Sequence, residues 1–224
     1  MNYNEAIKEL EKLSNPTFKN IKGMARFGIK PKTKLLCVPV PKLRKLAKKI
    51  GKNHNLALKL WDSKMHEARI LASIITEPEK LTEKQMDKWV KDFDTWDICD
   101  QTCMNLFGKS DYALKKIKKW SNSKDEFVKR TAFSLIAVMA VHNKEMKNEK
   151  FLEFFKLIKK ASTDERNFVR KAVNWALRQI GKRNLFLNKN ALQLADEILK
   201  INSKSAKWIA SDAIRELNQW KIRI

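Results

Sequence analysis

Two similar stretches, "FVKRTAFSLI" at residues 127–136 and "FVRKAVNWAL" at residues 168–177, decide the fold of this chain of 224 residues. Both place apolar side chains at helical spacing, both carry cations after Phe-Val, and the second follows the first by 41 residues. A second pair, "ALRQI" from Ala176 and "AIREL" from Ala213, is separated by 37 residues. A repeat near 40 residues is typical of helix pairs stacked into an array.

Helical patterns extend through the rest of the chain. Only 5 Gly and 5 Pro occur, and the period-two alternation of half-buried strands is lacking. "PKLRKLAKKIG" (residues 41–51) begins with Pro and ends with Gly, as helices prefer. We therefore predict an all-α protein, a HEAT-like helical-repeat solenoid (an α-α superhelix) with a concave basic groove. A compact bundle of unrelated helices is the alternative that the periodicity leaves open.

We predict a single domain over residues 1–224, with N-terminal helices and a loop in residues 1–40 and tandem helix pairs in residues 41–224. The one clear break in the helical pattern is "GIKPKTKLLCVPV" (residues 28–40), whose prolines predict a loop and a change of direction. No apolar run approaches the roughly 20 residues of a membrane span, and "MNYNEAIKELEKL" (residues 1–13) does not read as a signal peptide. Three cysteines form no disulfide framework, so we expect a cytoplasmic protein.

The charge balance indicates a polyanionic partner. The chain carries 48 Lys and Arg against 25 Asp and Glu, which gives a net charge of +23 and a pI near 10.0. The cations recur inside amphipathic segments, which predicts a charged face on a folded body. Nucleic acid is the commonest partner of such a face, while an anionic membrane or an acidic protein would also suit it.

One predicted helix, from about Thr95 to Phe107, combines aromatic and acidic side chains. Trp96 and Asp100 are four residues apart and share a helix face, and Asp97 lies three residues before Asp100. Two carboxylates so close raise the pKa of one of them, although nearby cations oppose this. For Asp97 we favour an interaction with the free N–H groups at the helix start, a role that explains Asp100 less well.

A second tryptophan lies among cations. Trp175 shares a helix face with Lys171 and Arg178, and Lys129 and Arg130 occupy the corresponding helix one repeat earlier. A core tryptophan is rarely flanked by two cations on its own side, although a place at the edge of an inter-helix seam is the simpler alternative. We predict a basic groove with two indoles and one carboxylate in its floor.

Motifs in this order and spacing resemble a known family. "WDICD" (residues 96–100), "FVKRTA" (127–132) and "FVRKAVNWALR" (168–178) are similar to the bacterial alkylpurine DNA glycosylases of the AlkD type, which are built from HEAT-like repeats. "MARFGI" (24–29) and "VPVPKLRKLAKKIG" (38–51) resemble the N-terminal segment of that family. The likeness covers most of the chain.

The resemblance implies roles for individual residues. Trp96 and Trp175 would face the damaged nucleotide, and Asp100 would be the catalytic carboxylate. Arg130 would grip the DNA backbone beside it, and Phe27 stands where the family has an aromatic residue. The reaction implied is hydrolysis of the N-glycosidic bond of N3- and N7-alkylated purines, without metal or cofactor and without moving the base into a deep pocket. The cations expected to contact DNA with Arg130 and Phe27 are Lys129, Lys171, Arg178 and Arg44.

The chemistry of such a lesion agrees with these roles. A purine alkylated at N3 or N7 is cationic and leaves as a neutral base, so it needs no general acid. A carboxylate stabilises the positive charge that develops on the sugar and can position a water. Each indole face attracts a cation by about 0.5–2 kcal/mol. We therefore predict a monomeric DNA repair glycosylase that acts on double-stranded DNA containing alkylated bases.

Two other functions fit the same sequence. One is a catalytically silent DNA-binding protein that recognises bent, branched or damaged DNA. The other is a HEAT-type scaffold whose basic groove binds an acidic protein. We predict no metal site, because the histidines lack ligand spacing and Cys99 and Cys103 fit small buried positions. The tryptophans predicted to lie in helix seams are Trp61, Trp89, Trp120, Trp208 and Trp220.

Overall fold

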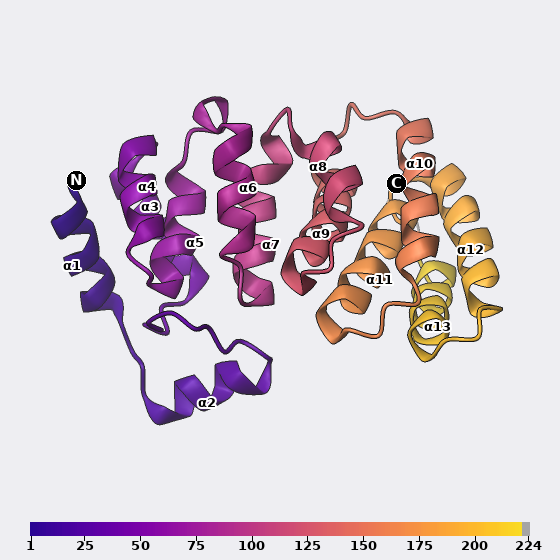
Figure 1. Cartoon of the computed structure of the whole chain (residues 1–224), viewed down its shortest axis with the longest axis horizontal. Helices are drawn as coiled ribbons and strands as arrows, with labels where there is room; N and C mark the ends of the chain where they lie inside the picture. The colour runs from indigo at the N-terminus through magenta and orange to yellow at the C-terminus, as the bar shows by residue number, and fades with distance from the viewer. Residues whose placement is uncertain (221–224) are drawn as a thin grey trace. The chain divides into compact units, whose positions relative to one another are not determined.

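The computed structural model describes residues 1–220, and helices are their only regular secondary structure. They form thirteen α-helices and two short 3₁₀ helices, with no strand among them (Figure 1). The predicted all-α, helical-repeat fold is confirmed. Every helix among the described residues is too short or too polar to span a lipid bilayer. The chain divides into two compact units, Met1–Asp111 (unit 1) and a second that begins at Tyr112 (unit 2).

Unit 1 is organised around one central helix. Its elements are α1 (Tyr3–Leu13), α2 (Phe18–Arg26), α3 (Val40–Ile50), α4 (His54–Asp62), α5 (His66–Ile75), η1 (Pro78–Lys80), α6 (Glu83–Lys91), α7 (Trp96–Asn105) and η2 (Phe107–Lys109). Helix α5 packs against α3, α4 and α7, and nine of its ten residues are buried. The fully buried indoles of Trp61 and Trp89 stack with their centroids 3.9 Å apart, as predicted for seam tryptophans.

The predicted loop between α2 and α3 is confirmed, and a buried carboxylate holds it. Glu67 of α5 accepts the backbone N–H groups of Leu36 at 2.9 Å and Val38 at 3.3 Å. Cys37, between these two donors, has a φ of 56°, in the left-handed region that non-glycine residues rarely adopt. The loop therefore turns over a fixed anchor in the core of unit 1.

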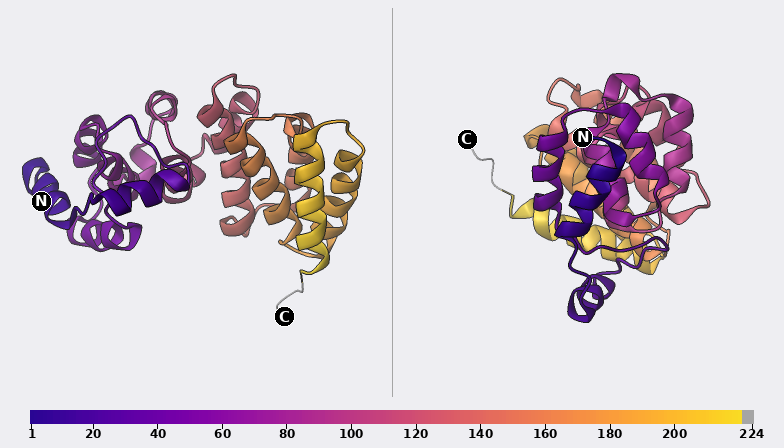
Figure 2. Two further views of the ribbon diagram at one scale, coloured as in Figure 1. Left: turned by 90° about the horizontal axis from the view of Figure 1, so that it is seen from below. Right: turned by 90° about the vertical axis from the view of Figure 1, so that its left-hand side faces the viewer.

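Unit 2 contains the repeats that the sequence reveals. Its helices are α8 (Ala113–Trp120), α9 (Glu126–His142), α10 (Asn148–Ala161), α11 (Asn167–Gly181), α12 (Leu185–Leu199) and α13 (Lys204–Asn218). Helices α9, α11 and α13 pack in that order, while α10 packs against α12, so successive helix pairs stack (Figure 2). The repeat stretch of residues 127–136 lies in α9, which is buried over most of its length.

Acidic side chains link each repeat of unit 2 to the next. Glu126 at the start of α9 accepts the backbone N–H of Phe168 in the first turn of α11 at 3.2 Å. Glu165 before α11 accepts the backbone N–H of Ser205 at 3.1 Å and the hydroxyl of Ser203 at 3.0 Å, at the start of α13. A carboxylate at a helix N-terminus satisfies free N–H groups and complements the helix dipole. The repeats are thus joined by caps as well as by apolar contacts.

Candidate functional site

Helix α7 positions the first tryptophan and the candidate carboxylate. It begins at Trp96 after the N-cap residue Thr95, close to the predicted start. Trp96 is half-buried, and its indole Nε1–H donates to the carbonyl oxygen of Phe27 at 2.9 Å. Asp100 follows one turn later with an exposed fraction of 9%. Neighbouring turns of α7 therefore carry the Trp96 indole, whose orientation is fixed, and the Asp100 carboxylate, which has little access to water.

Asp97 has a partner that the sequence does not reveal. Its Oδ2 lies 2.8 Å from Nε2 of His66, which is buried at the start of α5. Burial raises the pKa of the Asp97 carboxyl, but the hydrogen bond and charge of His66 outweigh burial and lower that pKa overall. Burial likewise lowers the pKa of His66, and the bond and charge of Asp97 outweigh it, so that pKa is raised. Asp97 lies in the first turn of α7 as predicted, and it also joins α7 to α5 through an ion pair.

Two further predicted DNA-contacting residues lie in unit 1. The Arg44 guanidinium of α3 donates from Nη2 to the side-chain oxygens of Gln101 and Asn105 on α7, both at 3.4 Å. Phe27, just after α2, is 64% exposed and has the Arg26 guanidinium 5.3 Å from its ring centroid. Helix α7 therefore contacts both an exposed arginine and the segment that carries an exposed phenyl ring.

The cations predicted on α9 have bonds within the protein. Arg130 is 5% exposed, and its Nη1 donates to the carbonyl oxygen of Phe168 at 2.7 Å. Lys129 pairs with Asp164 at 2.8 Å, and Asp164 also binds Arg166. Burial raises the pKa of the Asp164 carboxyl, but its bonds to Arg166 and Lys129 outweigh burial and hold that pKa well below its ordinary value. Arg130 and Lys129 thus fasten α9 to the start of α11, and their contacts with DNA stay a prediction.

Helix α11 carries the second predicted group. Trp175 is half-buried and Lys171 is exposed. Arg178 forms ion pairs with Asp212 at 3.6 Å and with Glu216, both on α13. Part of the charge predicted for DNA is therefore paired with acids of the next repeat.

Trp208 was predicted to lie in a helix seam, but it is 38% exposed with the Arg170 guanidinium 5.0 Å from its ring centroid. Because α13 is the last described helix, no later helix among residues 1–220 covers this face. An indole beside an arginine at the surface is a combination common at binding surfaces, and the sequence reading missed it.

The predicted site residues fall into two groups, one in each unit. Phe27, Arg44, Trp96 and Asp100 belong to unit 1. Lys129, Arg130, Lys171, Trp175 and Arg178 belong to unit 2. The convergence of the two groups on one reaction centre stays a prediction.

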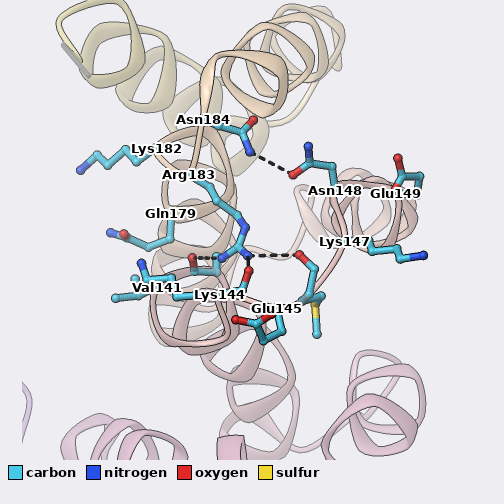
Figure 3. Close-up of a pocket in the computed structure, with 12 residues that line it drawn as sticks. Val141, Lys144, Glu145, Lys147, Asn148, Glu149, Gln179, Lys182, Arg183 and Asn184 are labelled. Carbon is cyan, nitrogen blue, oxygen red and sulfur yellow. Dashed lines mark hydrogen bonds between the residues drawn. The ribbon is translucent and has the colours of Figure 1, made fainter. Parts of the chain in front are cut away.

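A cavity of about 820 Å³ in unit 2 has a different role (Figure 3). It lies between the end of α9, the start of α10 and the turn that joins α11 to α12. Arg183 reaches into it and donates to the carbonyl oxygens of Ala140 at 3.0 Å, Lys144 at 2.8 Å and Met146 at 3.1 Å. The guanidinium thus binds one carbonyl in the last turn of α9 and two in the loop between α9 and α10. None of the predicted site residues, all within the described chain, lines the cavity.

We expect Arg183→Ala to lower the free energy of unfolding by about 2 kcal/mol, because three carbonyl oxygens lose a charged donor. Urea denaturation of the purified protein measures this change. Lys144→Ala is the matched control, since it removes an exposed cation that lines the same cavity and keeps the backbone carbonyl that Arg183 binds. Equal stability of the two variants would show that the Arg183 bonds contribute nothing net.

Comparisons with known proteins identify the family. Residues 6–217 match the family model described as DNA alkylation repair enzyme. The chain is 25% identical over 221 residues to the uncharacterized protein Lin0241 of Listeria innocua, and the alignment covers 96% of each chain. It is 29% identical over 130 residues to the uncharacterized protein Lmo0209 of Listeria monocytogenes, and that alignment covers 57% of each chain.

A solved structure shares the fold. It is described as a new family of proteins related to the HEAT-like repeat DNA glycosylases with affinity for branched DNA structures. The match has a TM-score of 0.78 at 20% identity and covers 96% of this chain and 95% of that one. Because the family model matches residues 6–217, nearly the whole length of this chain, the chain belongs to the DNA alkylation repair enzyme family.

Proposed function

We propose that this protein is a DNA glycosylase that hydrolyses the N-glycosidic bond of cationic N3- and N7-alkylated purines in duplex DNA. The observation that carries the proposal is the pair on α7, in which the nearly buried Asp100 carboxylate follows one turn after the half-buried Trp96 indole. A nearly buried carboxylate in a chain of net charge +23 is suited to a cation that the DNA itself supplies. Membership in a DNA alkylation repair family supports the same substrate class.

The proposed reaction begins with departure of the base. The bond between C1′ and the purine nitrogen breaks, and its electron pair neutralises the cationic base. The sugar becomes positive, and the Asp100 carboxylate stabilises it more strongly than it would in bulk water, because little solvent screens a group that is 9% exposed. Water then adds to C1′ and loses its proton to the carboxylate or to solvent.

The two indoles select the charged lesion in this proposal. The bond from Trp96 to the Phe27 carbonyl fixes the orientation of one ring before substrate arrives. Trp175 supplies the second ring from α11, beside the exposed Lys171. Aromatic faces attract cations, so an alkylated purine gains binding energy that an ordinary purine does not. We propose that the protein acts in this way as a monomer and in the cytoplasm.

The test is release of free base from DNA. Methylated duplex DNA incubated with the purified protein should yield 7-methylguanine or 3-methyladenine, which chromatography with mass spectrometry quantifies. Unmethylated DNA of the same sequence should yield no base. Absence of release from methylated DNA by a folded protein that binds the duplex would refute the proposal.

Affinity for branched DNA without base release is the second candidate function. The buried Arg130, bonded to the Phe168 carbonyl, favours it, because a guanidinium held in this way is less available to a scissile nucleotide. The solved relative at 20% identity is described as having such affinity. Tight, salt-sensitive binding to a four-way junction together with no base release would support this candidate.

A further inference from the structure

One part of the sequence contains cations but no acids. Residues 12–61 hold 14 Lys and Arg and no Asp or Glu, whereas the chain as a whole has about one acid for every two cations. This segment includes α2, the loop after it, α3 and all of α4 except its last residue, Asp62. Its positive charge is therefore not balanced by acids close in sequence, and an anionic ligand would be attracted to this part of unit 1.

Helix α2 stands apart from the other helices of unit 1, as Figures 1 and 2 show from different directions. None of its nine residues, all described by the structure, is buried. Near its N-terminal end, Asn20 Nδ2 donates to the carbonyl oxygen of Asn15 at 2.8 Å. Just after its C-terminal end, the Trp96 indole of α7 donates to the carbonyl oxygen of Phe27. Phe18, its first residue, is 79% exposed. A helix with so little apolar contact is suited to pack against a ligand.

A groove of about 790 Å³ separates α2 from the body of unit 1. Its walls are α2, the loop before α3, and parts of α3, α5 and α7. Phe27 and Trp96 line it together, and the exposed cations Lys19 and Lys42 lie on its α2 and α3 walls. The carboxylates of Glu67 and Asp97 also line it, but Glu67 is bonded to backbone N–H groups of the loop and Asp97 to His66. The volume lies within the range of about 300–1,000 Å³ typical of small-molecule sites. We call this space the α2 groove.

We propose that the α2 groove binds an unpaired strand of DNA that continues from a duplex held by the protein. Bases of an unpaired strand would stack against the exposed phenyl ring of Phe27, and Lys19 and Lys42 would hold the phosphates. The indole of Trp96, which the proposed function assigns to the lesion, would hold Phe27 in place through its bond to the Phe27 carbonyl. Aromatic faces with cations along a groove are the usual means of binding single strands. Duplex bases already stack on one another, so only unpaired bases can use the Phe27 ring. The inference rests on the DNA binding of the proposed function, but not on base release.

A lipid surface is the other polyanion that a basic amphipathic helix can bind. Lipid binding requires a helix that lies flat with its apolar side chains toward the membrane. Here the aromatic rings of Phe27 and Trp96 border a concave space that also contains the amides of Asn20 and Gln101. Hydrogen-bonding side chains inside a groove suit nucleotides better than acyl chains.

Binding to tailed DNA tests the proposal. Fluorescence anisotropy compares a blunt duplex, the same duplex with a single-stranded tail of about ten nucleotides, and the same duplex with a tail of abasic sugar-phosphate. The wild-type protein should bind the base-containing tail about tenfold more tightly than the abasic tail, an effect equivalent to stacking about one base. Equal affinity for the two tails would overturn the proposal, because charge alone would then explain any preference.

Gly23 provides a variant that blocks the groove. It lies in α2 and lines the groove, and a Cβ added there meets nothing within 4 Å, so the backbone at this position accepts a side chain. Gly23→Trp should abolish the preference for the base-containing tail and leave blunt-duplex affinity within about twofold. Gly23→Ala, which changes helix propensity without filling the groove, should behave as wild type. An undiminished preference in Gly23→Trp would refute the assigned site.

Two further measurements separate the possible failures. Base release from blunt methylated duplex tests the proposed glycosylase independently of any tail. The tail preference can therefore fail while release succeeds, and the reverse also holds. Co-sedimentation with vesicles of anionic phospholipid tests the lipid alternative. Vesicle binding that Gly23→Trp weakens, in a protein without tail preference, would reassign the α2 groove to lipid.

Discussion

Asp100→Asn is expected to lower the single-turnover rate of 7-methylguanine release by about 100-fold or more. A carboxylate that stabilises a developing cation lowers the activation free energy, and loss of its charge slows the reaction by about this factor. The amide keeps the size of the side chain, and the residue is 9% exposed, so water gains little access in its place. The affinity for methylated duplex should stay within a few-fold, because the variant removes no cation that binds phosphate.

Asp111→Asn is the matched control for this experiment. It removes one negative charge from unit 1 at an exposed position and should leave the release rate unchanged. Circular dichroism and urea denaturation of both variants establish that they fold. A folded Asp100→Asn protein that releases base at the wild-type rate would show that the carboxylate does not act in the reaction.

Asp97→Asn should lower the free energy of unfolding by about 3 kcal/mol near pH 5, because it leaves the charge of the buried His66 without its partner. The pKa of His66 is raised above its ordinary value of 6.5, so its contribution is complete below that pH and is lost as the pH rises through the folded pKa. The pKa of Asp97 is lowered below 3.8, so its contribution is present above that pH and is lost as the pH falls through the folded pKa. The difference between wild type and variant is therefore largest between about pH 4 and 6.5.

Urea denaturation at a series of pH values measures this difference. Asp62→Asn serves for comparison, since it breaks the exposed ion pair with Lys88 and should cost at most about 1 kcal/mol. A flat difference for Asp97→Asn between pH 5 and pH 9 would contradict an ionised His66–Asp97 pair.

The helical array could be predicted because its signals are local or periodic. The spacing of 41 residues between the Phe-Val stretches predicts stacked helix pairs, and α9 and α11 do pack against each other. The Pro and Gly that bound residues 41–51 locate α3 at Val40–Ile50, where Gly51 adopts a φ of 74° that favours glycine. The proline-rich loop was predictable for the same reason. Such features depend on a few neighbouring residues, so the sequence displays them directly.

The partners of charged groups could not be predicted in this way. His66 and Asp97 are 31 residues apart, and Arg130 finds the carbonyl of Phe168 38 residues away. A cation on a helix face has the same pattern in sequence whether it binds phosphate or the next repeat, because only the fold brings its partner close. Arg178 illustrates this, since it lies on a helix as predicted and its charge is paired with Glu216 of the next repeat.

The α2 groove had a sequence signal that was not used. The absence of acids from residues 12–61 marks the segment that forms much of its wall. The groove itself depends on the turn of residues 28–40 over Glu67, which no local pattern reveals. Composition can therefore indicate where an anion is attracted, while the shape of its site requires the tertiary structure.

The acidic caps of unit 2 give its array a direction. Glu126 caps α11 and Glu165 caps α13, so in both cases the accepting carboxylate precedes in sequence the helix whose N–H group it binds. Loss of the last helix pair would leave the start of α11 satisfied, whereas loss of α9 would expose backbone N–H groups at that start. During synthesis, each emerging helix of this series therefore meets a carboxylate that is already in place, and the array can grow stepwise from its N-terminal end.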